Sequence, residues 1–197
     1  MEYHLSTPLR ERDVRELSAG DVVYITGHIF TARDEAHHKL IEMFDKGERL
    51  PFNPEEMALF HCGPVMRKIG DRWSVFAAGP TTSARMEMFE YDFLKRFRTR
   101  MIIGKGGMGE KTARACREFG AVYTSYTGGA GALAATSVKS VEAVYWLEEL
   151  GMPEAVWILK VENFGPLIVG IDAKANSLYR DVEESVAERV KGVLEGL

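Results

Sequence analysis

The sequence predicts a mixed α/β fold, with a sheet that contains both parallel and antiparallel strands. In the first half of the chain, short apolar runs are separated by tight-turn residues, which is typical of β-hairpins. In the second half, apolar runs alternate with amphipathic helical patterns, which is typical of β–α units. With 197 residues, 46% of them hydrophobic, the chain can bury a sizeable core, and we expect residues 1–197 to form one domain.

The first elements follow from apolar runs and cap residues. Residues 1–20 are polar with widely spaced apolar positions, which predicts a lead-in strand or loop, and residues 22–26 are predicted as a buried strand. A helix is expected to begin at Thr31, because Thr31 and Asp34 form a capping-box pattern, and to end at Gly47.

The middle of the chain contains a hairpin signal. Residues 57–61 are predicted as a strand, and residues 65–69 and 73–78 flank a Gly-Asp turn at positions 70–71. A helix follows, and the hydroxyl groups just before it are expected to cap it. Its apolar face is predicted to consist of Met86, Phe89, Phe93 and Phe97.

The rest of the chain is predicted to alternate between strands and helices. The predicted segments are strands at 100–103 and 121–126, helices at 110–119 and 138–150, and a strand pair at 156–161 and 167–171. A final helix is expected to start near Asp181, where Glu184 completes a capping box. Its buried face is predicted to contain Val182, Val186, Val190 and Leu194.

Composition excludes several classes of protein. The formal net charge of −4 gives no basic excess, so a nucleic-acid partner is not expected. Two cysteines, Cys62 and Cys116, are too few for a disulfide framework, or for a zinc or iron–sulfur site built from thiolates alone. The first 21 residues contain no apolar run, so we expect neither a signal peptide nor a membrane span, and predict a cytoplasmic protein.

Three cations occupy an unusual position in this pattern. Arg33, Arg85 and Lys105 each follow a predicted strand and lie near the start of a predicted helix. A helix N-terminus carries partial positive charge, so a cation there is unfavourable unless an anion lies nearby. Because ligands of α/β sheets bind beyond the carboxyl ends of strands, three such cations favour a site for a small dianion. Thr81 and Thr82 would contribute hydroxyl groups to it.

Each cation also has a simpler interpretation. It can be a solvated surface residue, or it can pair with Asp34, Glu87 or Glu110. His38 is a candidate for orienting Arg33 or a substrate. Asp34 with His37 and His38 supplies too few ligands for a metal centre, so no metal site is predicted.

Residues 104–109 match the pattern G-x-G-x-x-G, after a predicted strand and before a predicted helix. This context makes a dinucleotide-binding oxidoreductase an alternative. However, no acidic residue lies between Glu118 and Glu142, where the ribose-binding acid is expected. The glycines can equally form a tight turn with close helix–strand packing.

Three motifs in this order and spacing connect the chain to a known family. They are Thr31-Ala32-Arg33-Asp34 with Ala36-His37, Gly79-Pro80-Thr81-Thr82-Ser83 with Arg85-Met86, and Ile103-Gly104-Lys105-Gly106-Gly107-Met108. Over nearly its whole length the chain resembles the class I (iron–sulfur) fumarate hydratases, namely their β subunit or C-terminal domain. The L-tartrate dehydratase β subunit is a close relative of that β subunit.

The resemblance implies a swivelling β/β/α domain with a mixed sheet and helices. It also implies a partner, the α subunit, whose three cysteines would hold a [4Fe–4S] cluster, and an α2β2 assembly. The reaction implied is the reversible hydration of fumarate to L-malate, with the iron acting on the hydroxyl group. L-tartrate dehydration is the nearest alternative, and a non-catalytic anion-binding module is a third.

The resemblance also implies roles for individual residues. Arg33, Arg85 and Lys105 would bind carboxylate and hydroxyl oxygens of the substrate. Thr81 would be the base that removes the C3 proton of malate, with its pKa lowered by the nearby cations. The secondary substrate contacts would be Thr82, the backbone amides of Gly104 and Gly106, and His38.

Overall fold

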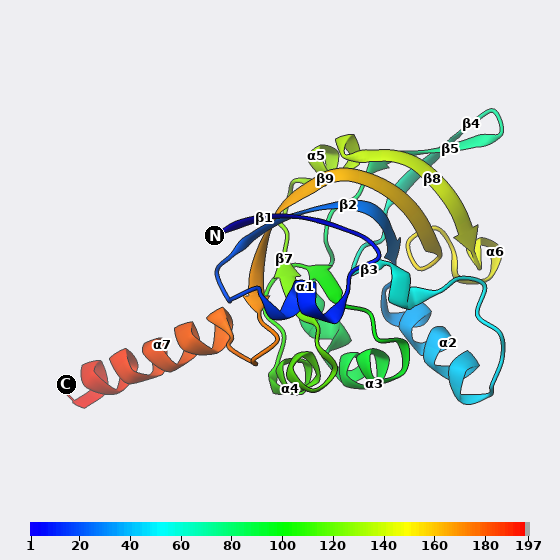
Figure 1. Cartoon of the computed structure of the whole chain (residues 1–197). Coiled ribbons are helices and arrows are strands. Elements are labelled where there is room, and N and C mark those ends of the chain that lie inside the picture. Colours follow the sequence, from blue (N-terminus) through cyan, green and yellow to red (C-terminus); the bar gives the residue numbers. More distant parts are fainter. Residues whose placement is uncertain (196–197) are drawn as a thin grey trace.

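The computed structural model describes residues 1–195 (Figure 1). Its helices are α1 (Glu11–Arg15), α2 (Asp34–Asp45), α3 (Glu87–Phe97), α4 (Glu110–Phe119), α5 (Gly131–Thr136), α6 (Leu147–Leu150) and α7 (Leu178–Glu195), with 3-10 turns η1 (Pro54–Glu56) and η2 (Ser83–Met86). Its strands are β1 (Glu2–Ser6), β2 (Val22–Thr31), β3 (Ala58–Phe60), β4 (Val65–Ile69), β5 (Arg72–Ala77), β6 (Met101–Gly104), β7 (Val122–Ser125), β8 (Val138–Tyr145) and β9 (Val156–Ile171).

Seven of the strands form one mixed sheet in the order β1-β2-β3-β6-β7-β9-β8. The pairs from β1 to β7 are parallel, whereas β9 runs antiparallel to β7, β8 and β2. Because β2 pairs with both β3 and β9, strands β2, β3, β6, β7 and β9 close into a ring. The predicted mixed α/β fold is confirmed, and so is the hairpin, which forms the separate sheet β4–β5.

Alternation along the strands of the ring separates two hydrophobic cores. Phe60 and Ile103 belong to a first core that contains mainly sheet residues. Their neighbours Leu59 and Ile102 belong to a second core, which lies between the sheet and helices α2, α3 and α4. Figure 1 shows these three helices side by side on one side of the sheet. Successive side chains of a strand point to opposite faces, so each short strand contributes to both cores.

Two predicted elements in the second half of the chain are wrong. Residues 138–150 were expected to be one helix, but they form β8 and the short helix α6. Residues 156–161 and 167–171 were expected to be a strand pair, but they belong to the single strand β9. The reason is tertiary pairing: β8 pairs with β9 along its length, and register shifts in the β2–β9 ladder let β9 continue past Asn163.

The predicted helix caps also differ from the structure. Thr31 is the last residue of β2, and its hydroxyl accepts a hydrogen bond from the Trp157 backbone amide at 3.0 Å, so Arg33 is the N-cap of α2. Thr82 precedes η2 without a capping hydrogen bond from its side chain. Helix α7 begins at Leu178, before the predicted box at Asp181.

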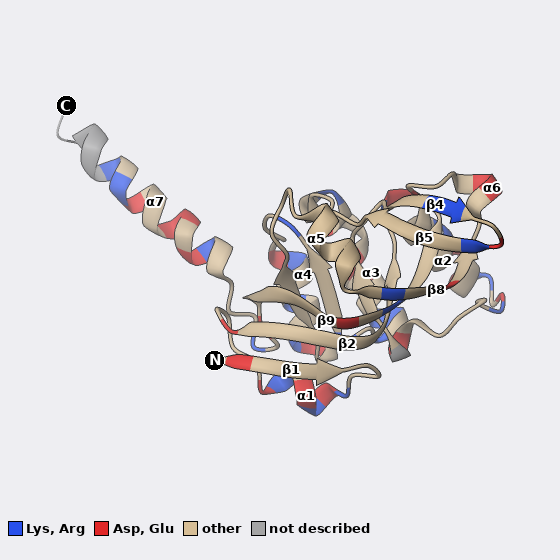
Figure 2. Ribbon diagram, turned by 90° about the horizontal axis from the view of Figure 1, so that it is seen from above, with Lys and Arg blue, Asp and Glu red and all other residues tan. Residues whose placement is uncertain are grey.

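Helix α7 projects away from the sheet, as both views show (Figure 1, Figure 2). Val182, Val186 and Val190 are 63%, 53% and 50% exposed, so the prediction that they are buried is wrong. Leu194, predicted on the same face, lies outside the described side chains. An apolar stripe on a helix does not show which part of the protein covers it, and the rest of this domain leaves the valines of α7 exposed. Among residues 1–195, no helix has the length and apolar character needed to cross a membrane.

Candidate functional site

The candidate site lies at the edge of the sheet where the parallel strands β2, β3 and β6 end. Arg33, His61 and Lys105 follow these three strands within two residues of their ends. Carboxyl ends of parallel strands meet at one edge, so the topology brings these residues to one side of the molecule.

The segment that contains Thr81 crosses this edge and is hydrogen-bonded to it. The Thr81 amide donates to the His61 carbonyl at 2.7 Å, and the Ser83 amide donates to the Lys105 carbonyl at 3.0 Å. Thr82 forms a β-bridge with Lys105. Thr81 is half-buried and Thr82 is exposed, so both hydroxyl-bearing residues lie beside the Lys105 turn.

Arg33 is held only in part by neighbouring residues. Its Nε lies 3.3 Å from Oε1 of Glu154, but outside hydrogen-bond geometry, and among the described residues this buried nitrogen has no hydrogen-bond partner. A Cβ on Gly63 would lie 2.8 Å from Nη1 of Arg33, so the glycine leaves room for the guanidinium. Burial raises the pKa of Glu154, although the Arg33 charge opposes that rise.

Arg85 joins its turn to the Arg33 turn. Its Nη2 donates to Oδ2 of Asp34, the residue after Arg33. The simpler interpretation, an ion pair with Asp34, therefore holds for this cation. About half of the Arg85 side chain remains exposed, 51%, so part of its guanidinium faces solvent.

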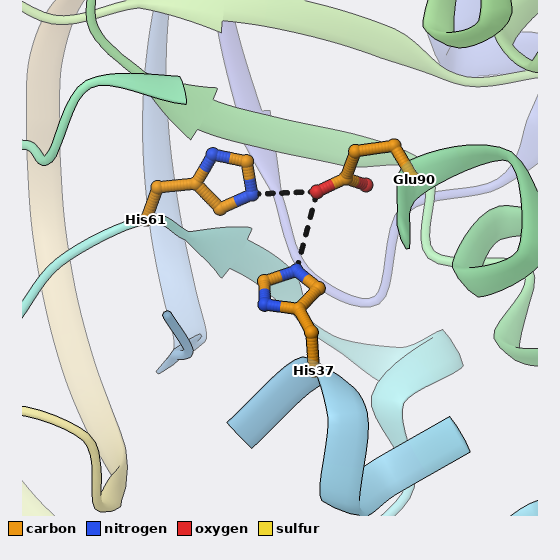
Figure 3. Close-up of side chains that lie close together, drawn as sticks. All are labelled: His37, His61 and Glu90. Atoms are coloured by element: carbon orange, nitrogen blue, oxygen red, sulfur yellow. Dashed lines mark hydrogen bonds and ion pairs between the residues drawn. The ribbon is translucent and has the colours of Figure 1, made fainter. Parts of the chain in front are cut away.

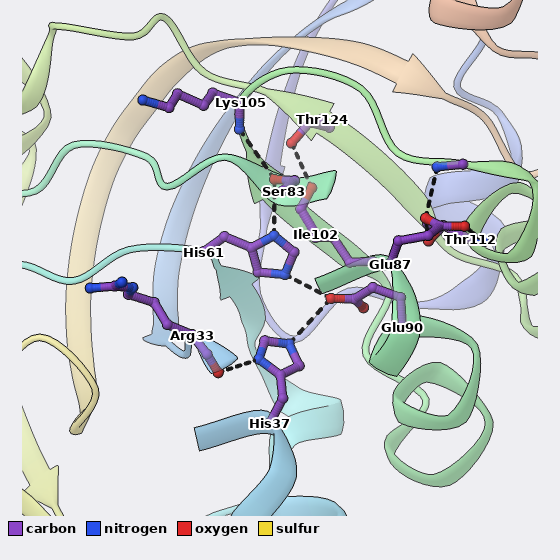
Figure 4. A network of polar contacts seen from close by, with 11 residues as sticks. Arg33, His37, His61, Ser83, Glu87, Glu90, Ile102, Lys105, Thr112 and Thr124 are labelled. Carbon is purple, nitrogen blue, oxygen red and sulfur yellow. Dashed lines mark hydrogen bonds and ion pairs between the residues drawn. The ribbon is translucent and has the colours of Figure 1, made fainter. Parts of the chain in front are cut away.

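Among the described side chains, Lys105 has no acidic partner within ion-pair distance. Glu154, Asp34 and Glu110 each pair with an arginine. Figure 4 shows the side chains of Lys105 and Arg33 extending to the same side, away from the buried residues between them. Both cations are therefore placed to meet a ligand from that side.

Gly104 and Gly106, the two glycines predicted to donate backbone amides, occupy positions where a larger residue would clash or be strained. A Cβ on Gly104 would lie 1.8 Å from Oγ of Ser83, so only glycine lets that hydroxyl pack against the end of β6. Gly106 adopts a φ of +72°, which favours glycine, and its carbonyl accepts from the Tyr123 hydroxyl at 2.8 Å.

The N-terminus of α4, which follows the glycine motif, is already capped by a carboxylate. Glu87 accepts hydrogen bonds from the backbone amides of Gly109, Lys111 and Thr112 at 2.7, 3.0 and 3.2 Å. A dinucleotide phosphate would need these amides. A cavity of about 580 Å³ lies beside this loop and the start of α7, and none of the three candidate cations lines it. The dinucleotide interpretation therefore finds no support here.

Beneath the cation-bearing turns lies a cluster of three fully buried side chains, His37 of α2, His61 after β3 and Glu90 of α3 (Figure 3). Oε1 of Glu90 lies 2.7 Å from Nε2 of His61 and 3.2 Å from Nε2 of His37. Burial alone raises the pKa of Glu90, but its contacts with the two histidines outweigh that effect and lower the pKa. Burial lowers the pKa of His61.

These three side chains are also the residues that come closest to a metal-binding set, with ligand atoms within 4.8 Å of one another. A tetrahedral zinc ion would hold two nitrogen or oxygen ligands about 3.3 Å apart. The 2.7 Å separation of His61 and Glu90 is that of a direct hydrogen bond. We therefore interpret His61 and Glu90 as a hydrogen-bonded pair, with His37 at ion-pair distance; among the described residues Nε2 of His37 and Oε2 of Glu90 have no hydrogen-bond partner.

The cysteines do not fit an iron–sulfur cluster. Cys62 and Cys116 are both fully buried and belong to different hydrophobic cores. Burial raises the pKa of both thiols, whereas cluster ligands are thiolates.

Sequence reasoning missed the buried network. It chose His38, which is exposed, whereas the ring that contacts the Arg33 carbonyl belongs to His37. Glu90 lies on the predicted apolar face of α3, between Met86 and Phe93, and a lone carboxylate in such a stripe is a usable signal.

Comparison with known proteins gives consistent matches. A family model described as Fumarase C-terminus matches residues 1–182. A Methanocaldococcus jannaschii protein, provisionally named L(+)-tartrate dehydratase subunit beta, is 48% identical, covering 98% of this chain and 99% of that protein. The L(+)-tartrate dehydratase subunit beta of Escherichia coli K12 is 42% identical over 99% of this chain and 95% of its own length. A Geobacillus stearothermophilus protein, provisionally named class I fumarate hydratase, is 43% identical over 94% of this chain but only 35% of its own length.

Proposed function

Because the chain belongs to the fumarase C-terminus family, we propose that it is the beta subunit of a hydro-lyase that interconverts fumarate and L-malate, with residues 1–197 as one domain. L(+)-tartrate dehydration is supported equally, because two relatives that match along almost their whole length carry that name. Both reactions remove water from a hydroxylated dicarboxylate, so the same kind of anion site serves either.

The observation that supports this proposal best is the state of the three cations. The Nε of Arg33 is buried and unsatisfied within the described residues, and half of Arg85 is exposed. Lys105 has no acidic partner among the described side chains and extends to the same side as Arg33. Arg33 and Arg85 each pair with one carboxylate but keep hydrogen-bonding capacity, and Lys105 is unpaired among the described side chains, which favours a ligand with two carboxylates.

In the proposed reaction, Arg33, Arg85 and Lys105 bind and orient the dicarboxylate. Thr81, deprotonated beside these cations, takes the proton from C3, and the electron pair of that C–H bond forms the double bond as the C2–O bond breaks and releases hydroxide. The abstracted proton and the hydroxide then leave together as water. The cations then stabilise the charge that develops on the carboxylate next to C3. Thr82, His38 and the amides of Gly104 and Gly106 are proposed as secondary contacts.

The chain's own cysteines do not fit the [4Fe–4S] cluster that the family resemblance implies, so we derive no step through it on this chain. We propose instead that an alpha subunit carries the cluster and closes the site from the exposed side, in a cytoplasmic α2β2 assembly. The subunit names of the relatives support such a partner.

The test uses the chain co-purified with its alpha subunit and assayed with fumarate, L-malate and L-tartrate. Arg85→Ala is expected to lower kcat/KM about 10²- to 10³-fold, because one arm of the carboxylate site is lost. The control is Arg114→Ala: Arg114 is 50% exposed and pairs with Glu118, so it matches Arg85 in exposure and pairing but lies on α4.

The better substrate among the three identifies the reaction. Equal activity of Arg85→Ala and Arg114→Ala would remove the site assignment. A complex that converts none of the three acids would remove the proposed function itself.

A further inference from the structure

A continuous series of polar contacts runs beneath the candidate site, from the Lys105 turn to the Arg33 turn (Figure 4). The Lys105 amide lies 3.2 Å from Oγ of Ser83, which lies 3.0 Å from Nδ1 of His61. Nε2 of His61 contacts Glu90 at 2.7 Å. The series therefore runs between two turns that lie far apart in the sequence, at Arg33 and Lys105.

On the Lys105 side, the direction of each hydrogen bond follows from chemistry. The Lys105 amide can only donate, so Ser83 Oγ accepts from it. The ionised Glu90 carboxylate can only accept, so Nε2 of His61 donates to it. If Nδ1 of His61 also carried a proton, the hydrogen of Ser83 would have no acceptor in this series. With a neutral His61 ring and Ser83 donating to Nδ1, each hydrogen of the Lys105 amide, the Ser83 hydroxyl and His61 Nε2 has an acceptor.

On the Arg33 side, the ring of His37 continues the series. Its Nδ1 donates to the Arg33 carbonyl at 2.7 Å, and the His37 backbone amide donates to the same oxygen at 3.0 Å. Its Nε2 lies 3.2 Å from the Glu90 oxygen that His61 also contacts, within ion-pair distance but outside hydrogen-bond geometry, so among the described residues this nitrogen has no hydrogen-bond partner. The Glu90 carboxylate thus lies between the two histidine rings.

The surroundings keep water away from the series. His37, His61, Ser83 and Glu90 are all fully buried, and the His37 ring packs against Phe93 with centroids 4.9 Å apart. A buried hydrogen bond has no competing water, so a missing partner leaves an unsatisfied group and moves the backbone it held. The series is therefore suited to fix the distance between the two turns.

We propose that Ser83, His61, Glu90 and His37 form a buried brace that sets the position of Lys105 relative to Arg33, and that they act as positioning residues for the dicarboxylate site. This inference rests on the proposed function. The same brace holds Thr81, since the His61 carbonyl accepts from the Thr81 amide at 2.7 Å. None of the four brace side chains needs to contact the substrate.

The sharpest variant is Ser83→Ala, which removes one hydroxyl and breaks the link between His61 and the Lys105 amide. Its matched control is Ser177→Ala, since Ser177 is also a buried serine whose hydroxyl accepts a backbone amide, that of Arg180 at 3.4 Å. In the α–β complex, Ser83→Ala is expected to lower kcat/KM about tenfold or more, while its melting temperature stays close to that of Ser177→Ala.

A double-mutant cycle separates positioning from general stability. If Ser83 acts through Lys105, then Ser83→Ala causes no further loss of kcat/KM in a Lys105→Ala background. Additive losses would show that Ser83 does not act through Lys105 and would overturn the proposal. The proposal would also be overturned if Lys105→Ala abolished activity but Ser83→Ala kept the kcat/KM of the unmodified complex. The proposed function would then remain intact.

A spectroscopic measurement on the purified chain does not depend on activity. Nitrogen-15 NMR of labelled histidine is expected to show His61 with a proton on Nε2 and none on Nδ1, and Ser83→Ala is expected to shift the Nδ1 signal. The Lys105 amide should exchange with solvent faster in Ser83→Ala than in Ser177→Ala. A His61 ring protonated on Nδ1, or unchanged Lys105 exchange, would contradict the brace. If the NMR result holds but Lys105→Ala retains full activity, the role assigned to Lys105 fails while the hydro-lyase activity stands, and the brace remains only a structural feature.

Discussion

Thr81 and Arg33 differ in how the structure restrains them, although both lie at the same edge of the sheet. The backbone of Thr81 is fixed by the His61 carbonyl at 2.7 Å, and its side chain is half-buried. The Arg33 guanidinium instead keeps an unsatisfied buried nitrogen within the described part of the chain. A fixed backbone limits where the Thr81 hydroxyl can lie, which suits proton transfer, and a guanidinium with unused hydrogen-bonding capacity suits anion binding.

Substitution of Thr81 tests its proposed role. Thr81→Ala is expected to lower kcat about 10²- to 10⁴-fold, the range for loss of a general base. Thr81→Ser keeps the hydroxyl and should retain most of the activity. The measurement is kcat with each substrate in the α–β complex. Comparable activity of the serine and alanine variants at full substrate saturation would show that the hydroxyl does not carry the proton.

At the scale of elements, the first turn of α3 supplies carboxylates to two different neighbours. Glu87 caps α4, and Glu90, one turn later, contacts His37 and His61. The helix therefore connects the loop after β6 to the buried brace.

The cap on α4 can be tested by stability. Glu87→Ala leaves the amides of Gly109, Lys111 and Thr112 without their acceptor. We expect the free energy of unfolding to fall by about 1–2 kcal/mol, which lowers the melting temperature by roughly 2–8 °C for a chain of this size. Glu188→Ala, an exposed acid on α7, is the control. Equal melting curves for the two variants would mean that the cap contributes little.

At the scale of the whole molecule, the buried brace makes folding sensitive to acid. Burial lowers the pKa of His61 in the folded state, so below its ordinary value of about 6.5 the unfolded chain binds a proton that the folded chain does not. The pKa of Glu90 is also lowered, because its histidine partners outweigh the effect of burial, so its contribution is lost as the pH falls below about 4.5.

We therefore expect the free energy of unfolding to fall as the pH decreases from about 7.5 to 5. Denaturant titrations at several pH values measure this slope. His61→Asn should reduce the dependence of the unfolding free energy on pH. His38→Asn, at an exposed position on α2, should leave that dependence unchanged. An unchanged slope in His61→Asn would show that another group causes the acid sensitivity.

Several parts of this protein follow from sequence alone, because the interactions that fix them are local. Alternating apolar residues, Gly70-Asp71 and the face of α3 predicted the hairpin, the mixed sheet and most helices. Residue type and spacing also selected Arg33, Arg85 and Lys105, and the structure places their turns at one edge.

Only the tertiary structure decided the rest. Residues 138–145 are extended because β9 pairs with them, and α7 leaves three valines exposed because it projects from the body. His37, His61, Ser83 and Glu90 come from four separate segments, and no local pattern records that their side chains meet. Their meeting depends on how helices α2 and α3 pack against strands β3 and β6, and only the folded chain establishes that packing.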